Sequence, residues 1–236
     1  EGMEESSALN RLFLLGTGSA ERHAEPPPPG GPDGPNAGTT YGELLPESAR
    51  AMLAAAGAGP DSVFYDLGCG TGGVVLQAAL SHGVKKAVGA ETVKSRFVKS
   101  CAAAEAWAKH GPVDPSQPPL PGSGKAGSKL AARGSSTMTD GSKQVVFQLA
   151  DLRSLDLSDA TIVHLSSTCF SDHLLSDMAM KLSAVLPDGA KVVSQRELRA
   201  LVPVSMQGPN GRAVKSSVAK DGATMLATVF QESHQA

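Results

Sequence analysis

The sequence has 236 residues, which is enough for one sizeable domain or two small ones. Its 21 Lys and Arg residues and 23 Asp and Glu residues leave a formal charge of −2, which excludes the strongly basic surface typical of nucleic-acid-binding domains. The three cysteines form no CxxC pair, so the sequence predicts neither a disulfide framework nor a metal site.

The N-terminal part, residues 1–38, is expected to be a flexible segment. Within it, EPPPPGGPDGPNAG contains ten Pro or Gly residues in fourteen, a density that cannot sustain a helix or a central strand. The apolar run LFLL is too short for a signal sequence or a membrane span. We therefore expect an intracellular protein, cytoplasmic or nuclear, that does not contact a membrane.

Residues 39–236 are predicted to form one domain in which helices and strands alternate. After Pro46, which favours a first helical turn, four apolar residues recur at helical spacing: Ala49, Met52, Leu53 and Ala56. The apolar stretch SVFYD then predicts a buried strand, and a glycine turn leads into the helix GGVVLQAALSH. A second strand, KAVGAE, follows, and Thr92 can cap the next helix.

Residues 111–143 are predicted to be a disordered insertion in this domain. They contain 17 Gly, Pro or Ser residues in 33, and too few large apolar side chains to offset the entropy lost on ordering. Beyond them, QVVFQLAD and ATIVHLS predict apolar strands, and Ser171 is expected to cap the helix DHLLSDMAMKLSAVL. The strand KVVSQ and a closing hairpin of RAVKSSVA and ATMLATVF complete the chain.

This alternation predicts the fold class. Strands that alternate with helices indicate parallel pairing, because a parallel pair needs a crossover and a helix supplies it. Strands that are apolar throughout are typical of a sheet covered on both faces. We expect an α/β fold with a doubly wound, mostly parallel seven-stranded sheet and an antiparallel C-terminal hairpin.

The glycine turn, in DLGCGTGG, follows the first central strand, where doubly wound sheets bind ligands. Gly68, Gly70 and Gly72 let the backbone approach a ligand closely. The glycines also match GxGxxG, so spacing alone leaves a dinucleotide such as NAD open. Asp66 favours S-adenosylmethionine instead, because a carboxylate repels a pyrophosphate and attracts an ammonium and a sulfonium. The alternative is that Asp66 only holds the turn by hydrogen bonds.

Two further acids end neighbouring strands. Glu91 can accept hydrogen bonds from both ribose hydroxyls of a nucleoside, a feature shared with NAD enzymes, or it can cap the following helix together with Thr92. Asp151 can accept a hydrogen bond from an adenine amino group while Leu152 packs on the ring, although Asp also commonly begins a turn. Three acids at three strand ends, with the glycine turn, predict a site for S-adenosylmethionine as the cofactor.

These stretches resemble a known family. YDLGCGTGG, VGAE and LAD together are similar to class I S-adenosylmethionine-dependent methyltransferases, and TTYGELLPESARAML ahead of them resembles the disruptor-of-telomeric-silencing family of non-SET histone lysine methyltransferases. The resemblance spans about residues 39–204. It implies methyl transfer to a lysine, with a lysine-bearing protein as the partner. The lysine-rich tract with which the family grips nucleosomes is not visible in this sequence.

The resemblance also implies roles for individual residues. Thr40, Tyr41, Gly42 and Glu43 match a loop that closes over the methionine end of the cofactor, with Gly68 and Gly70 beside that end, Gln77 in the following helix and Glu91 on the ribose. Where the family carries an Asn-Asn-Phe-type segment along its lysine channel, this sequence has LSSTCF. We therefore expect the acceptor side to be lined by Ser166, which also borders the cofactor, and by Ser167, Thr168 and Phe170, with Tyr41 opposite. Alternatively, these hydroxyls end a strand and lead into the cap at Ser171.

Methyl transfer from a sulfonium needs little beyond placing a neutral nucleophile in line, so no strong general base is required. His164 lies in an apolar strand and is predicted to be a satisfied core histidine, and Cys69 to be a small packing residue. Three other functions stay open at this point: a small-molecule methyltransferase with a closed pocket, an NAD-type oxidoreductase, and a binding module that keeps the fold without catalysis.

Overall fold

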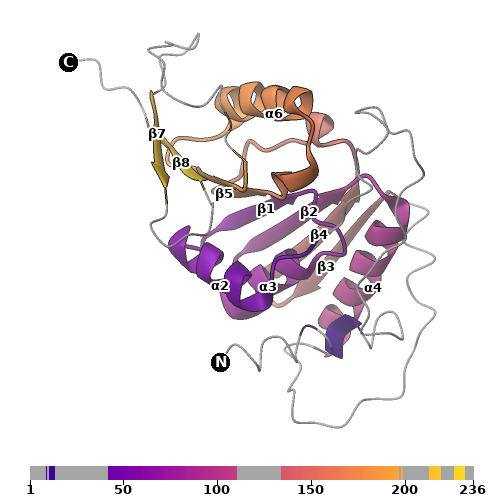
Figure 1. Cartoon of the computed structure of the whole chain (residues 1–236). Helices are drawn as coiled ribbons and strands as arrows, with labels where there is room; N and C mark the ends of the chain where they lie inside the picture. Colours follow the sequence, from indigo (N-terminus) through magenta and orange to yellow (C-terminus); the bar gives the residue numbers. More distant parts are fainter. Residues whose placement is uncertain are drawn as a thin grey trace.

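The structure is a computed structural model that describes residues 9, 11–13, 42–110, 134–196, 198, 213–218 and 226–231. Strands, helices and two single 3₁₀ turns (η) follow one another along the chain (Figure 1). Their bounds are α2 (Pro46–Ala55), β1 (Val63–Leu67), α3 (Gly73–Ser81), β2 (Lys86–Glu91), α4 (Lys94–His110), β3 (Ser135–Asp140), β4 (Lys143–Leu149), η2 (Leu152–Ser154), β5 (Ile162–Leu165), η3 (Ser167–Cys169), α6 (Asp172–Val185), β6 (Lys191–Ser194), β7 (Ala213–Val218) and β8 (Leu226–Gln231).

In the described part of the chain, eight strands form one sheet in the order β3-β4-β2-β1-β5-β6-β8-β7. The five strands from β4 to β6 in this order are parallel. Antiparallel strands flank them, with β3 beside β4 and the β7–β8 hairpin beside β6. The predicted fold class, a mostly parallel doubly wound sheet with an antiparallel C-terminal hairpin, is confirmed. The sheet has one strand more than the seven predicted.

The additional strand, β3, corrects the predicted insertion. Residues 135–140 pair antiparallel with β4, and Ser136 lies opposite Phe147. The prediction of disorder was wrong here, because a neighbouring strand supplies hydrogen-bond partners that weigh more than a polar composition. A polar strand is well suited to the edge of a sheet, where one face and one side stay in water. The first part of the predicted insertion, residues 111–133, lies outside the described residues.

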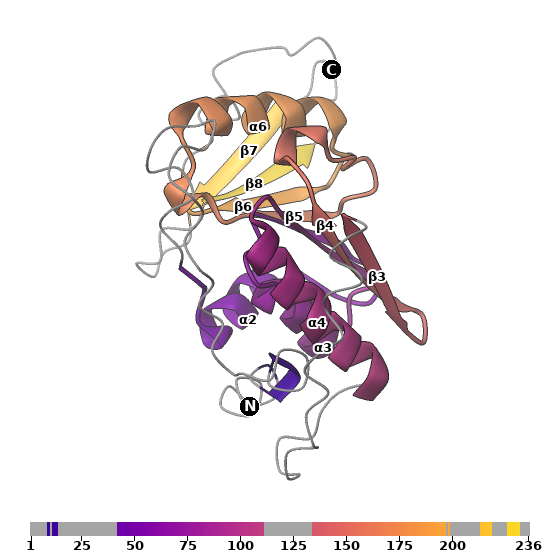
Figure 2. The same cartoon turned by 90° about the vertical axis from the view of Figure 1, so that its right-hand side faces the viewer.

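Helices cover both faces of the sheet. Figures 1 and 2 show α2, α3 and α4 on one face and α6 on the other. Because successive side chains of a strand point to opposite faces, Phe64 of β1 joins the core beneath α2, α3 and α4, whereas Tyr65 joins the core beneath α6. Among the described residues, no helix has both the length and the apolar character needed to cross a bilayer.

Part of the predicted flexible N-terminal segment belongs to the core. Leu9, Leu12 and Phe13 are helical and buried, at 2%, 0% and 1% exposure, and they pack in the same cluster as Trp107 of α4. The prediction was therefore wrong for these residues, because apolar side chains ahead of the Pro- and Gly-rich stretch reach the helical face of the sheet. The rest of residues 1–38 lies outside the described residues.

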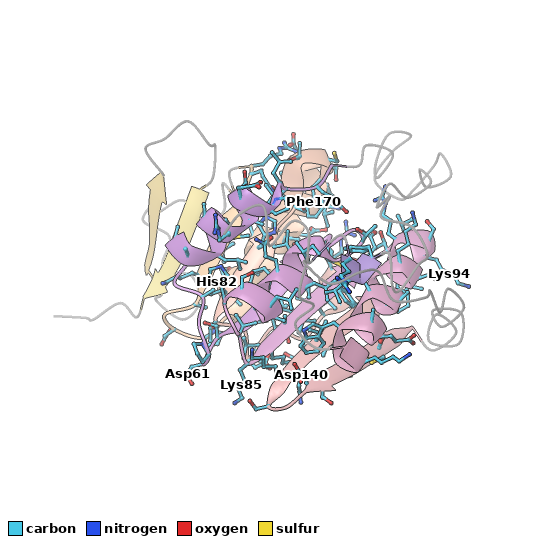
Figure 3. The ribbon with its side chains drawn as sticks, turned by 90° about the horizontal axis from the view of Figure 1, so that it is seen from below. Asp61, His82, Lys85, Lys94, Asp140 and Phe170 are labelled. Atoms are coloured by element: carbon cyan, nitrogen blue, oxygen red, sulfur yellow. The ribbon has the colours of Figure 1, made fainter. Side chains whose placement is uncertain are left out.

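The parallel core places the candidate site residues that follow its strands at one edge. The glycine turn follows β1, Glu91 ends β2, and the segment that contains Phe170 follows β5. Figure 3 shows Phe170 at the end of the sheet opposite Asp61, Lys85 and Asp140, which precede or connect strands at the amino edge. The carboxyl edge is thus where these separate segments meet, as expected for a doubly wound sheet.

Candidate functional site

The glycine turn has a conformation that its glycines permit. Gly68, Gly70 and Gly72 have φ angles of +84°, +57° and +87°, in the left-handed region that other residues rarely adopt. The backbone N–H groups of Gly68 and Cys69 both donate to the Ala90 carbonyl of β2, each at 3.0 Å. The turn is therefore fastened to the neighbouring strand before it enters α3.

Glu91 connects the same strand to the middle of the turn. Its side chain is buried at 5% exposure, and its Oε2 accepts a hydrogen bond from the Gly70 N–H at 2.9 Å. Its Oε1 accepts from the backbone N–H groups of Thr92 and Val93, both at 2.8 Å, just before α4. These two residues precede α4, so the carboxylate holds the link between β2 and the helix, and the capping alternative stays a prediction. The Thr92 hydroxyl also donates to Oε1, at the longer distance of 3.5 Å, so four donors within the protein face a carboxylate that has about four acceptor positions. The predicted hydrogen bonds of Glu91 to a ribose stay a prediction.

The segment ahead of α2 also reaches the glycine turn. The buried Thr71 hydroxyl donates to the carboxylate of Glu43, which lies on the surface. Deeper in the structure, Gln77 Nε2 of α3 donates to the Pro46 carbonyl of α2 at 2.7 Å. These bonds bring the Glu43 end of the predicted loop to the site. Thr40 and Tyr41, which were predicted to complete that loop, lie outside the described residues, so their roles stay predictions.

Phe170 covers the start of the glycine turn. A β-carbon added to Gly68 would lie 3.1 Å from Cζ of the Phe170 ring and 3.8 Å from Cβ of Ser166. The absence of a side chain at Gly68 therefore lets the segment after β5 approach the turn. Ser166 and Phe170 are each half-buried here. The structure brings these three predicted site residues together.

Ser167 is turned into the interior of the protein. Its side chain is fully buried, and its Oγ accepts from the Arg196 N–H at 2.9 Å and lies 2.8 Å from the Ser194 Oγ. Both hydrogen-bonding directions of the hydroxyl are therefore used inside the protein. This placement argues against the predicted contact of Ser167 with a methyl acceptor. It favours the alternative, in which these hydroxyls end a strand and lead into the cap at Ser171. Ser171 caps α6, as predicted, by accepting from the Leu174 N–H at 3.1 Å.

Asp66 is paired with a histidine inside the sheet. The two residues lie opposite each other on the neighbouring strands β1 and β5, and Asp66 Oδ1 is 2.8 Å from His164 Nδ1. Both side chains are buried, at 2% and 0% exposure, and His164 Nε2 lies 3.1 Å from Gln195 Nε2. The prediction that His164 is a satisfied core histidine is confirmed. One oxygen of Asp66 is engaged within the protein, so its predicted role toward a cationic cofactor stays a prediction.

Asp151 begins a turn at the same edge of the sheet. It caps η2 by accepting a hydrogen bond from the Arg153 N–H at 2.8 Å, and its exposed carboxylate lies 3.3 Å from the Arg153 guanidinium. Leu152 is buried at 5% exposure in the core beneath α6. The turn-forming alternative is therefore present. Contacts of Asp151 and Leu152 with an adenine stay predictions.

Two buried cysteines, Cys69 and Cys101, are not activated. Burial raises the pKa of the Cys69 thiol well above its ordinary value, aided by the negative charges of Asp66 and Glu91. Burial likewise raises the pKa of Cys101 to about 11. Both thiols therefore stay protonated at neutral pH, in agreement with the predicted packing role of Cys69. Among the described residues, no three His, Cys, Asp or Glu side chains gather as possible metal ligands.

Comparisons with known proteins agree with this arrangement. Residues 35–109 match the family model of the histone methylation protein DOT1, a range that includes Glu43, the glycine turn and Glu91. The crystal structure of an RNA methyltransferase from Salinibacter ruber in complex with S-adenosyl-L-homocysteine is similar over 83% of this chain and 97% of that one, with a TM-score of 0.52. The chain has the class I methyltransferase fold and resembles DOT1. At 22% identity, the likeness to the solved structure shows the fold alone.

Two curated proteins are similar to a part of this sequence. An H3 lysine-79-specific histone-lysine N-methyltransferase from Kluyveromyces lactis is 40% identical over 55 residues, which are 23% of this chain and 10% of the relative. A protein-lysine N-methyltransferase from Saccharolobus islandicus is 43% identical over 53 residues, which are 22% of this chain and 33% of the relative. The chain thus spans a tenth and a third of the lengths of these two relatives.

Proposed function

We propose that this chain is an S-adenosylmethionine-dependent methyltransferase whose acceptor is a lysine amine of a protein. One observation carries the proposal: Glu43 and Glu91, from two sides, hydrogen-bond to adjacent residues of the glycine turn, Thr71 and Gly70. The DOT1 family match covers all four residues. Such a turn, fixed by acids and open to a ligand at the carboxyl edge, is suited to a nucleoside with a positive charge and no phosphate.

The residues present fit this cofactor. Glu91 lies beside the glycine turn, and a ribose hydroxyl can replace the weakest of its present donors, the Thr92 hydroxyl at 3.5 Å from Oε1. When bound, the cofactor supplies an electrophilic methyl group on a sulfonium. Ser166 and Phe170 border the same turn, so we assign them to the acceptor side. Their task is to hold an amine in line with that methyl group and to exclude water.

A lysine acceptor must lose its proton before it can react. Its amine has a pKa of about 10.4 in water, and transfer into an apolar channel lowers that value by disfavouring the charged form. The Phe170 ring beside the glycine turn offers such an apolar wall. The names of the two curated relatives, both protein-lysine methyltransferases, support this acceptor class. The likeness to an RNA methyltransferase concerns the fold and does not favour RNA.

A binding experiment tests the cofactor. We expect S-adenosylhomocysteine, and not NAD, to raise the unfolding temperature, with about 2.7 kcal/mol of stabilisation at a roughly hundredfold excess over Kd. Stabilisation by NAD alone would instead identify an oxidoreductase. The variant Glu91→Gln should bind S-adenosylhomocysteine more weakly. Its matched control is Glu105→Gln, on α4 and away from the turn, which should bind like the wild-type protein.

A labelling experiment tests the acceptor. The protein is incubated with cofactor carrying a radioactive methyl group, together with purified core histones or with extract from cells that lack the protein. We expect label in lysine residues of one or a few proteins, identified by mass spectrometry. Label confined to RNA or to small metabolites would overturn the lysine assignment and leave methyl transfer standing. Cofactor binding without any labelled product would identify a binding module.

A further inference from the structure

A chain of side-chain contacts runs from the end of β1 to the acceptor-side segment, and the proposed reaction does not use it directly. It begins at Asp66 and His164, which share one face of adjacent strands. It continues to Gln195, which follows β6 and lies on the same face because Val193, two residues earlier, pairs with His164. It ends at Ser167, whose N–H donates to Gln195 Oε1 at 2.8 Å.

The Ser167 N–H fixes the direction of each hydrogen bond in this series of contacts. A backbone N–H can only donate, so the oxygen of the Gln195 amide must face Ser167 and its NH₂ group must face His164. The Nε2 atom of His164 therefore accepts. The ring proton then lies on Nδ1 and is donated to Asp66, so His164 is a neutral imidazole with its proton on Nδ1.

Gln195 and its neighbour hold the whole acceptor-side segment. The Arg196 N–H donates to Ser167 Oγ, and the Arg196 guanidinium donates to the Phe170 carbonyl and to the Asp172 carboxylate. The segment from Ser166 to Phe170 is only one 3₁₀ turn long and cannot keep its position by itself. The pair of residues that follows β6 thus helps to anchor the segment, together with the Ser166 N–H, which donates to the Leu67 carbonyl of β1 at 3.2 Å, and the contact between the Ser167 and Ser194 hydroxyls at 2.8 Å.

We propose that Gln195 is a positioning residue. It donates a hydrogen bond to the neutral tautomer of His164 on one side and holds the acceptor-side segment against Gly68 on the other. Its amide supplies a donor for Nε2 of His164 and an acceptor for the Ser167 N–H at the same time. A side chain with only acceptors or with neither would satisfy one partner at most. The consequence for catalysis rests on the function proposed above, whereas the tautomer and the position of the segment do not.

The tautomer is tested by NMR of the imidazole nitrogens of His164. In the wild-type protein at neutral pH we expect a protonated Nδ1 and an unprotonated Nε2. The near-isosteric substitution Gln195→Glu replaces the NH₂ donor by an acceptor, so His164 should bind a second proton at Nε2. A wild-type ring protonated at Nε2, or a ring unchanged by Gln195→Glu, overturns the inference. The matched control is Gln144→Glu, on the exposed surface of β4, which should leave the His164 signals unchanged.

The position of the segment is tested through Cys169, which is half-buried within it, whereas Cys69 and Cys101 are fully buried. The rate at which iodoacetamide modifies Cys169 reports how often the segment opens. Gln195→Met keeps the length of the side chain and removes both hydrogen bonds. We expect it to raise the Cys169 rate about tenfold, which corresponds to about 1.4 kcal/mol of easier opening, whereas Gln144→Met leaves the rate unchanged. Equal rates in the wild-type protein and Gln195→Met overturn the inference, provided that both unfold cooperatively on heating.

The catalytic consequence is a separation of binding from turnover. Gln195→Met should bind S-adenosylhomocysteine with a Kd within about twofold of the wild-type value and transfer methyl groups about tenfold more slowly, because Gln195 touches the acceptor-side segment and not the glycine turn. Loss of cofactor affinity equal to the loss of turnover overturns a positioning role. If the wild-type protein transfers no methyl group at all, the proposed function fails, and the NMR and Cys169 measurements still decide the inference.

Discussion

The Thr71 hydroxyl donates a hydrogen bond to the Glu43 carboxylate, so a buried residue of the glycine turn is tied to a surface residue that precedes α2. The two residues are 28 positions apart in the sequence. The bond therefore holds Glu43 at a position that local sequence alone would not determine. Because the turn is the proposed cofactor site, its connection to Glu43 bears on ligand affinity as well as on stability.

We predict that Thr71→Val weakens binding of S-adenosylhomocysteine about fivefold, by loss of roughly one hydrogen bond or about 1 kcal/mol. Valine keeps the shape of threonine and removes only the hydroxyl, and the Glu43 carboxylate lies on the surface. Isothermal calorimetry measures the change. Thr139→Val, on the exposed side of β3, is the control. An unchanged affinity in Thr71→Val would show that the loop does not take part in binding.

We predict that Glu91→Gln destabilises the protein and weakens cofactor binding. The amide offers one acceptor oxygen where two oxygens now serve the N–H groups of Gly70, Thr92 and Val93, so at least one buried donor loses its partner at a cost of about 1–3 kcal/mol. Urea unfolding measures the cost. Glu105→Gln should not destabilise, because burial raises the pKa of Glu105 and already disfavours its charged form. Equal stability of the two variants would contradict the assignment.

We predict that Gly68→Ala costs more stability than Gly189→Ala. The two glycines have nearly the same φ, +84° and +80°. Both substitutions therefore place an alanine in the left-handed backbone region, which costs about 1–2 kcal/mol. At Gly68 the new β-carbon also lies 3.1 Å from Phe170, whereas at Gly189 it meets nothing within 4 Å. Adding Phe170→Leu to Gly68→Ala should recover part of the difference. Equal costs at both glycines would mean that the Phe170 ring does not lie over the turn.

We predict an alkaline loss of stability from Tyr65. Burial and its hydrogen bond to Asp159, at 2.7 Å, hold the pKa of the Tyr65 phenol well above its ordinary value of 10.0. In the unfolded chain this phenol ionises first, so its contribution to stability is complete below pH 10 and is lost as the pH rises further. Tyr41→Phe leaves Tyr65 as the only tyrosine, and its phenolate absorbance can then be titrated. Asp159→Asn should lower that pKa, and no change would remove Asp159 as the cause.

We predict that the protein loses stability at acid pH when Asp159, the partner of Tyr65, becomes protonated. Burial tends to raise the pKa of Asp159, but hydrogen bonds from Lys86 and Tyr65 outweigh it, so the pKa lies below its ordinary value of 3.8. Because the folded state favours the carboxylate, this contribution is present above about pH 4 and lost as the pH falls through the folded-state pKa. Urea unfolding across this range should show a shallower pH dependence for Asp159→Asn than for the wild-type protein. An equal pH dependence of the unfolding free energy in the two proteins would contradict this prediction.

Local patterns in the sequence determined the main elements of the fold. Apolar periodicity, Pro46 at a helix start and Ser171 at a helix cap predicted α2 and α6, because these preferences act between residues less than two turns apart. The glycine turn was predictable for the same reason, since a sharp turn between a strand and a helix needs φ angles that glycine adopts most readily. The hydrogen bonds from Thr92 and Val93 to Glu91, just before α4, are equally local.

Only the tertiary structure decided which residues meet. The pairing of β3 with β4 overrides a polar composition, and the order of β1, β5 and β6 brings Asp66, His164 and Gln195 together although up to 98 positions separate neighbouring partners. The same packing turns Ser167 inward and Phe170 toward Gly68, although both stand in one short polar run. Periodicity states which face a side chain takes within its own element, whereas the neighbour on that face is set by strand order, and strand order is a property of the whole chain.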